Sequence, residues 1–330
     1  GVEFGINCMM FDTGVKFRGV RDVPAGLTFA YHSCGMGPKQ GFFLSLSGGD
    51  IKVTSWDPSN EEILPESLLP NNSLEALHNA VKQGFLMDQL GPYPTEHHHT
   101  WRNLTCYISS SVLKRAKCET GVIIHAGHEE DEALLKIPGI EKNSFTEVQH
   151  KPHFCPLSQF KSESLQKLRA ILADPQSSNG LRAQSATAHL ADKSALALEI
   201  LRSHFDDNWK ELLGELQLSF ILFLMLYSHD ALTYWKEMAD LLANSGHLLR
   251  TNVGFSTGFM RILYEELNFS PEDFFETELS MDNFLRPILS NLFLNLEAGE
   301  DEVQLPDDVS EHRFRLLTFV RKKFSLFEED

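Results

Sequence analysis

Three consecutive histidines, His97, His98 and His99, are the clearest metal-binding candidates in this sequence. Zinc is bound by histidine, cysteine and carboxylate side chains whose spacing lets them converge on one ion. Adjacent side chains of a helix or a strand point in different directions, so three neighbours rarely bind the same ion. The pattern therefore favours a solvated loop, and we expect neither a metal nor another cofactor.

Two further segments contain the residue types of enzyme motifs but not the spacing. Ser228-His229-Asp230 has the three residues of a hydrolase triad, yet such triads assemble from positions that are distant in sequence. The segment Gly35–Gly41 is rich in glycine but lacks the Gly-Lys-Ser/Thr ending of a phosphate loop. We expect a capping turn at the first segment and a turn before a strand at the second.

Five scattered cysteines form no Cys-x-x-Cys pair, which favours reduced thiols over a disulfide framework or a zinc site. Cys106 or Cys155 could act as a nucleophile, although no local signature supports this. A catalytic site assembled from remote residues would need His125 or His153 beside Cys155 or an acid. No motif carries catalysis, and the sequence predicts a protein that is not an enzyme.

The composition points to a globular protein that binds other proteins. The 330 residues carry a net charge of −17, and both halves of the chain are acidic. An acidic surface argues against direct binding of nucleic acid. The apolar run Leu218–Tyr227 is shorter than the roughly 20 residues that span a bilayer, so a buried helix is expected and no membrane association.

The first part of the chain reads as strands and turns. Short aromatic and β-branched segments lie between glycine and proline breaks, and Gly41–Leu46 is predicted to form a hairpin with Ile51–Trp56. Helical spacing follows in Leu74–Leu90 and in Trp101–Leu113. We predict a β-rich, sandwich-like domain over residues 1–135 and a linker over residues 136–152.

The second part of the chain, residues 153–330, is predicted to be entirely helical. From about residue 186 its apolar residues recur at helical spacing, with short breaks such as Asn244-Ser245-Gly246. The last helix is expected to bury a stripe that includes Phe314, Leu317 and Val320. The fold class is therefore α+β, with an antiparallel helical array similar to VHS domains after the β-rich domain.

Several blocks, taken in order, resemble the A1-cistron-splicing-factor family. Each block is weak alone, but their order and spacing are specific and cover most of the chain. The blocks are Glu3–Ile6, Lys16–Val20, Val23–Gly26, Gly41–Leu44, Leu90–Pro94 with Trp101 and Leu104-Thr105, then Gly214-Glu215-Leu216-Gln217-Leu218-Ser219-Phe220, Trp235, Asp273–Phe275 and Asp282–Leu285.

The resemblance implies a non-enzymatic chaperone that helps to assemble the spliceosomal U5 small nuclear ribonucleoprotein. Family members bind the RNase H-like region of the large spliceosomal scaffold, pre-mRNA-processing factor eight, and some also hold its Jab/MPN domain. They keep the small nuclear RNA and the helicase away until the particle matures. The resemblance implies a protein of cytoplasm and nucleus that does not itself bind nucleic acid.

Where the chain begins and ends bears on this expectation. It starts inside the first family block and ends at Asp330. We therefore expect an initial strand to be absent, together with the C-terminal strand that joins a partner's sheet in some relatives. Both absences weaken the expectation that the Jab/MPN domain is bound at the same time.

Three residues are candidates for binding and its control. Tyr234 and Phe274, near predicted helix ends, could be exposed anchors for a partner, although core packing is the alternative. Ser245, in a break predicted to be an exposed loop, is the candidate phosphorylation switch, because phosphate is disfavoured near a helix C-terminus. A plain capping turn is the alternative there.

A trafficking adaptor that binds peptides or cargo is the alternative function.

Overall fold

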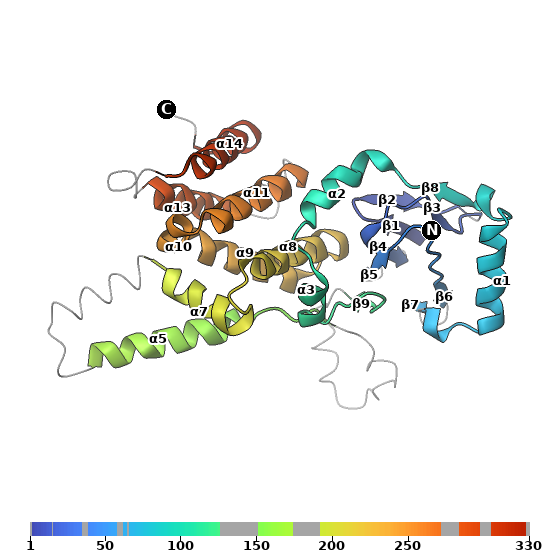
Figure 1. Cartoon of the computed structure of the whole chain (residues 1–330), viewed down its shortest axis with the longest axis horizontal. Coiled ribbons are helices and arrows are strands. Elements are labelled where there is room, and N and C mark those ends of the chain that lie inside the picture. Colours follow the sequence, from blue (N-terminus) through green and yellow to red (C-terminus); the bar gives the residue numbers. More distant parts are fainter. Residues whose placement is uncertain are drawn as a thin grey trace. The chain divides into compact units, whose positions relative to one another are not determined.

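The computed structural model describes residues 2–14, 16–34, 39–57, 62–64, 66–125, 151–173, 192–271, 284–297 and 305–327. The chain divides into two compact units (Figure 1). The first comprises Gly1–His153 together with Leu218–Leu232, and the second comprises Phe154–Gln217 and Thr233–Asp330. The predicted linker 136–152 lies almost wholly outside the described residues, and the grouping of Leu218–Leu232 with the first unit was not anticipated.

The first unit is built on a five-stranded sheet in the order β2-β1-β4-β5-β9, with antiparallel neighbours throughout. Strands β3 and β8 pair in parallel in a second sheet, and β6 pairs with β7 in a third. The strands are β1 Val2–Ile6, β2 Met9–Asp12, β3 Gly19–Arg21, β4 Gly26–Cys34, β5 Gln40–Leu46, β6 Ser55–Asp57, β7 Glu62–Leu64, β8 Leu90–Pro92 and β9 Ile124–His125.

A buried asparagine ties the sheet to the segment after β8. Asn7, in the β1–β2 turn with φ of 52°, accepts the Phe29 amide at 2.9 Å and donates to the Tyr93 hydroxyl at 2.9 Å. The left-handed conformation is one that asparagine tolerates better than most residues. Trp101, 1% exposed, donates its indole N–H to the Leu27 carbonyl at 2.6 Å. The polar groups at these buried positions are therefore paired, as burial demands.

The predicted hairpin between Gly41–Leu46 and Ile51–Trp56 is wrong. Strand β5 pairs with β4 and β9. Residues 51–54 form no strand, and β6, which follows them, pairs with β7. The turn Ser47–Asp50 does form, closed by the Asp50 amide on the Ser47 carbonyl at 3.1 Å. A local turn signal was read correctly, but it did not determine which strand lay beside β5.

Helices in the first unit are short. The predicted helix Leu74–Leu90 ends early, at Lys82, and the predicted helix Trp101–Leu113 is two helices separated by a turn. Gly84, with φ of 79°, follows the end of α1 and adopts a conformation that favours glycine. The helices are η1 Glu66–Leu68, α1 Asn71–Lys82, η2 Met87–Gln89, η3 Thr95–His97, α2 His98–Leu104 and α3 Ser110–Arg115.

The second unit is helical in its described residues, which confirms the predicted α+β class. Residues 153–330 were predicted to be helical, but no individual helix was predicted at α5, which buries only Leu157 and Ser164. The predicted helix start at Ser270–Asp273 lies mainly outside the described residues. The helices are α5 Leu157–Ala173, α7 Ser194–His204, α8 Trp209–Leu226, α9 His229–Ala243, α10 Gly246–Thr251, α11 Val253–Phe269, α13 Leu285–Glu297 and α14 Asp307–Phe324.

Helix α8, which runs across the division between the units, contains the predicted buried run. Every residue from Leu212 to Phe223 is buried, including Glu215, Gln217 and Ser219. Burying one leucine or phenylalanine side chain stabilises a fold by about 1.5–3 kcal/mol, so this run contributes strongly. The helix ends where Tyr227, 67% exposed, turns to a φ of 60°. Within the described residues, the search for a helix long and apolar enough to cross a membrane found none.

Candidate functional site

The family block Gly214–Gln217 places a buried carboxylate at a junction of three segments in the second unit. Glu215 is 0% exposed, and its Oε1 accepts the Cys155 amide at 2.6 Å and the Tyr234 hydroxyl at 2.7 Å. His204 Nε2 lies 3.9 Å from its Oε2. The ring of Phe154 stacks on that of Tyr234 at 4.6 Å. This set, the Glu215 clamp, joins α8 and α9 to the segment that leads into α5.

The clamp gives the family block a structural role. Gly214, Leu216, Gln217 and Phe220 are also buried, and a buried carboxylate with two donors is costly to remove because the donors lose their acceptor. Tyr234 is therefore not the exposed anchor that was predicted: it is 8% exposed, and its hydroxyl is used inside the unit. The other predicted anchor, Phe274, lies outside the described residues.

A second buried acid joins α9 to α11. Trp235 donates its indole N–H to Glu266 Oε2 at 2.9 Å, and both residues are almost wholly buried. Burial raises the pKa of Glu266 well above its usual value, and the hydrogen bond from Trp235 offsets only part of that shift. The ring of Phe284 meets Trp235 edge-on at 6.2 Å. Burial therefore favours the neutral form of this acid inside the helical unit.

Ser245 is not in an exposed loop, so the premise of the predicted switch is wrong. It is 0% exposed, and its hydroxyl donates to the Leu241 carbonyl at 2.8 Å. The first turn of α10 is already occupied by an acid, because Asp192 accepts the His247 amide at 3.0 Å and the Ser194 amide at 2.8 Å. This small polar residue is packed at the helix junction and bonded back to α9, which sequence alone could not separate from regulation.

The Asp192 cap is itself charged. Burial alone would raise the pKa of Asp192, but hydrogen bonds from Ser194 and His247 outweigh burial and lower the pKa. Gly246 packs against α13 so tightly that an added Cβ would lie 2.8 Å from Asn295 Oδ1. The Asn244–Gly246 break is thus a closely packed junction between α7, α10 and α13.

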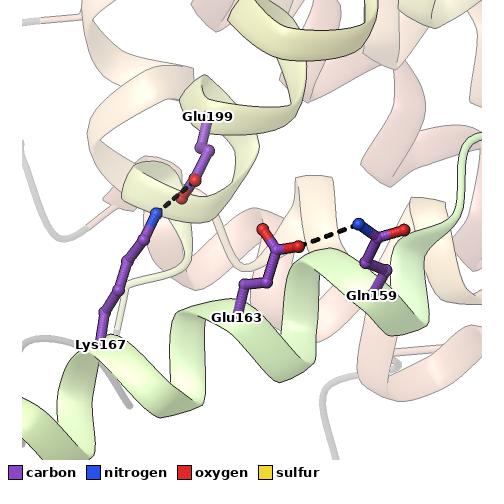
Figure 2. A network of polar contacts seen from close by, with 4 residues as sticks. All are labelled: Gln159, Glu163, Lys167 and Glu199. Carbon is purple, nitrogen blue, oxygen red and sulfur yellow. Dashed lines mark hydrogen bonds and ion pairs between the residues drawn. The ribbon is translucent and has the colours of Figure 1, made fainter.

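Helix α5 is held to the unit mainly by polar contacts. Figure 2 shows Lys167 reaching across to Glu199 of α7, and Gln159 donating to Glu163 at 2.9 Å one turn along α5. Lys161 forms an ion pair with Glu237 of α9 at 2.7 Å. Exposed ion pairs of this kind contribute at most about 1 kcal/mol each. Polar side chains therefore provide several of the contacts that hold α5 to α7 and α9.

The residues suspected of metal binding or catalysis include several with plain structural positions. His97 ends η3 while His98 and His99 begin α2, so they lie in helices and not in the predicted loop. Ser228 caps α9 by accepting the Ala231 amide at 3.3 Å, and Cys155 is 3% exposed. Of the residues with a described placement, no group of three histidines, cysteines or acids could hold a metal ion.

One shallow cavity of about 170 Å³ lies in the first unit, beside the outer part of β5. Lys52 and Glu66 are its charged lining residues, and Phe42, Leu44 and Val53 supply apolar walls. The space is smaller than a typical ligand pocket, which holds about 300–1,000 Å³. This cavity therefore offers little support for a small-molecule site.

Exposed apolar side chains are concentrated in one segment of the first unit. Four large apolar side chains are exposed here: Leu68 by 67%, Leu77 by 39%, Phe85 by 72% and Met87 by 45%. Helix α1, which contains Leu77, has no buried residue. A helix with an apolar stripe normally buries it against a neighbour. We call these four residues the Leu68–Met87 surface. It was not predicted, because the sequence indicated only helical spacing over Leu74–Leu90.

Comparison with known proteins assigns the chain to a family. Residues 1–118 match the family model described as the AAR2 N-terminal domain, and residues 169–327 match that described as the AAR2 C-terminal repeat region. The protein AAR2 homologs of Macaca fascicularis and Homo sapiens are each 30% identical over all of this chain and 89% of their own length. The chain belongs to the AAR2 family.

The resemblance to the A1-cistron-splicing-factor family, drawn from short sequence blocks, is thereby confirmed. The protein AAR2 homolog of Caenorhabditis elegans is 26% identical over 98% of this chain and 90% of its own length. The Glu215 clamp and the Asp192 cap lie mostly in the part that matches the AAR2 C-terminal repeat region, and the Leu68–Met87 surface lies in the AAR2 N-terminal domain.

Proposed function

We propose that this AAR2-family chain is a non-enzymatic splicing factor that assists assembly of the U5 small nuclear ribonucleoprotein. Its partner would be the RNase H-like domain of pre-mRNA-processing factor eight, with the Jab/MPN domain as a further contact. By occupying that domain it would block early binding of small nuclear RNA and helicase. The observation that carries the proposal is family membership across both halves of the chain.

The described surface supports direct binding of a partner protein by exposed side chains. Glu215, in the family block Gly214–Gln217, is buried and hydrogen-bonded, so it is suited to keeping the second unit rigid. A rigid surface binds with less loss of conformational entropy than a mobile one. The Leu68–Met87 surface offers exposed apolar anchors, and a few such residues usually provide most of the affinity of an interface.

We place the apolar part of the scaffold interface on the Leu68–Met87 surface, with Phe85 as its main anchor. Phe85 is 72% exposed, so its ring contributes little to folding and can transfer wholly into a partner pocket. Truncating an interface anchor typically weakens binding by at least about 2 kcal/mol, or roughly 30-fold. The proposal implies a protein found in both cytoplasm and nucleus, where particle assembly would take place.

The test is affinity purification of the full chain from nuclear extract at low and high salt, with mass spectrometry of what is retained. We expect the large scaffold to be retained by the wild-type chain and lost with Phe85→Ala. Leu294→Ala is the matched control, because Leu294 is 60% exposed on α13 and lies in the other unit. An extract in which no scaffold is retained, with sorting peptides or cargo in its place, would contradict the proposal and favour the adaptor alternative.

A further inference from the structure

The last helix has a packed side and a side whose residues are exposed within the described part of the chain. Helix α14 runs beside α11 (Figure 1), and it buries Val309, Leu316 and Val320, which recur at helical spacing. Phe314 stands two residues before Leu316, about 200° around the helix from it, and is 72% exposed. The expectation that Phe314 belongs to the buried stripe is therefore wrong.

The same part of α14 is basic within an acidic protein. Five cations and no acid lie between Arg313 and Phe324, in a chain whose net charge is −17. At least two of the cations hold α14 to the rest of its unit. Arg313 forms an ion pair with Glu297, and Lys323 donates to the Leu267 and Asn268 carbonyls at 2.9 and 2.8 Å, at the C-terminus of α11.

The other three cations stand near Phe314 on the side of the helix that faces solvent. Arg315, Arg321 and Lys322 are exposed, and the guanidinium of Arg315 lies 4.3 Å from the ring centre of Tyr264 on α11. Helical spacing places Thr318 and Arg321 one and two turns beyond Phe314 on the same side. We call Phe314, Arg315, Thr318, Arg321 and Lys322 the α14 outer face.

We propose that the α14 outer face is a docking site for an acidic segment of a partner protein that carries an apolar or aromatic side chain. The three cations would attract the acidic residues, and Phe314 would contact the apolar one. The chain as a whole has a net charge of −17, so an acidic partner is favoured at this basic segment over an average part of the protein. Stacking of Arg315 on Tyr264 holds one cation in place, which reduces the entropy lost on binding.

An acidic peptide fits this face better than a nucleic acid does. Binding a phosphate backbone draws on many cations, often six or more, whereas three face outward here. The net charge of −17 also disfavours a long polyanion, which would extend past the helix toward acidic surface. A short segment of a protein can be confined to the α14 outer face. This proposal does not depend on which scaffold the Leu68–Met87 surface binds.

The test uses the full chain and three labelled probes, read by fluorescence anisotropy at 50 and 300 mM salt. The first is a twelve-residue peptide of glutamates and aspartates with a central Leu-Trp pair, and the second has Gly-Ser in place of that pair. The third is a twelve-nucleotide oligouridylate. We expect the first peptide to bind about fivefold more tightly than the second, from the lost apolar contact, and to weaken at high salt.

Two variants and one control locate the binding. Phe314→Ala should reduce affinity for the first peptide about fivefold and leave affinity for the second unchanged. The pair Arg321→Glu and Lys322→Glu should reduce affinity for both peptides at least tenfold. The pair Arg169→Glu and Arg202→Glu makes the same change of net charge at exposed positions of α5 and α7 and should leave binding within twofold.

Three outcomes would overturn the proposal. They are equal binding by wild type and the α14 variants, equal loss with the control pair, and oligouridylate binding tighter than that of the first peptide and lost with the same variants. Retention of the scaffold in the purification experiment is a separate result. Failure at the α14 outer face and failure of the proposed function can therefore be told apart.

Discussion

Helices α8 and α14 have the same length, 18 residues, and use their polar and aromatic residues in opposite ways. Helix α8 buries Glu215 and Gln217, and the acid is paired with donors from other segments. Helix α14 turns Phe314 and three cations to solvent. The comparison indicates that buried polar residues specify how this fold is assembled, while exposed apolar and basic residues are available for partners.

The largest effect should come from removing the buried acid of α8. Glu215→Ala leaves the Cys155 amide and the Tyr234 hydroxyl buried without their acceptor, so we expect a loss of about 3–5 kcal/mol of unfolding free energy. Urea unfolding followed by circular dichroism at 222 nm measures it. Glu215→Gln keeps an acceptor oxygen and should lose less than half as much. A loss below 1 kcal/mol for Glu215→Ala would show that the clamp is not structural.

A comparable effect is expected at the α7–α10 junction. Ser245→Glu places a second carboxylate in a buried site near Asp192 and should destabilise the second unit by about 3 kcal/mol or more. Ser245→Ala, which loses one hydrogen bond, should cost about 1 kcal/mol. Thermal unfolding of both variants is the measurement. If Ser245→Glu leaves the melting temperature unchanged but weakens partner binding, Ser245 is a switch and the structural interpretation is wrong.

A smaller effect should appear as a pH dependence at Glu266. Its pKa is raised in the folded state, so the folded protein keeps a proton that the unfolded chain releases above its own pKa. Its contribution to stability is therefore present at low pH and lost as pH rises from about 4.5, by at most about 1.4 kcal/mol per pH unit. Glu266→Gln cannot ionise, so its stability relative to wild type should increase from pH 5 to pH 8. A difference that is constant with pH would show that Glu266 is ionised when buried.

The smallest effect on stability is expected on the outside of α14. Phe314→Ala should change the unfolding free energy by less than about 0.5 kcal/mol, because the ring is already 72% exposed. Leu316→Ala, two residues further on and 1% exposed, should cost about 2–5 kcal/mol. Urea unfolding of the two variants side by side checks the contrast. Equal losses would mean that Phe314 is packed in solution.

An element could be predicted from the sequence when its local pattern of apolar residues matched its burial in the fold. The run in α8 is apolar on every side, so its burial followed directly from composition. No individual helix was predicted at α5, and its ion pairs from Lys161 to α9 and from Lys167 to α7 could not be foreseen from residue spacing. The strand pairing of β5 was wrong because a turn fixes only its nearest neighbours, while sheet order is a long-range property.

The site was harder to predict than the fold. Tyr234 and Ser245 were chosen as polar or aromatic residues near helix ends, and both turned out to be buried and hydrogen-bonded. The sequence does not show which other segment of the chain packs against a given helix end. Phe314 was expected in one stripe with Leu317 and Val320, whereas the residues that α14 buries are Val309, Leu316 and Val320. An error of about half a helical turn, or two residues, is enough to exchange a core residue for a surface one.

The most direct test of the account is calorimetric titration of the purified full chain with the purified RNase H-like domain of pre-mRNA-processing factor eight. The account predicts a one-to-one complex that Phe85→Ala weakens by roughly 30-fold and Leu294→Ala leaves unchanged. The absence of binding by a folded wild-type chain, or equal loss with both variants, would contradict it.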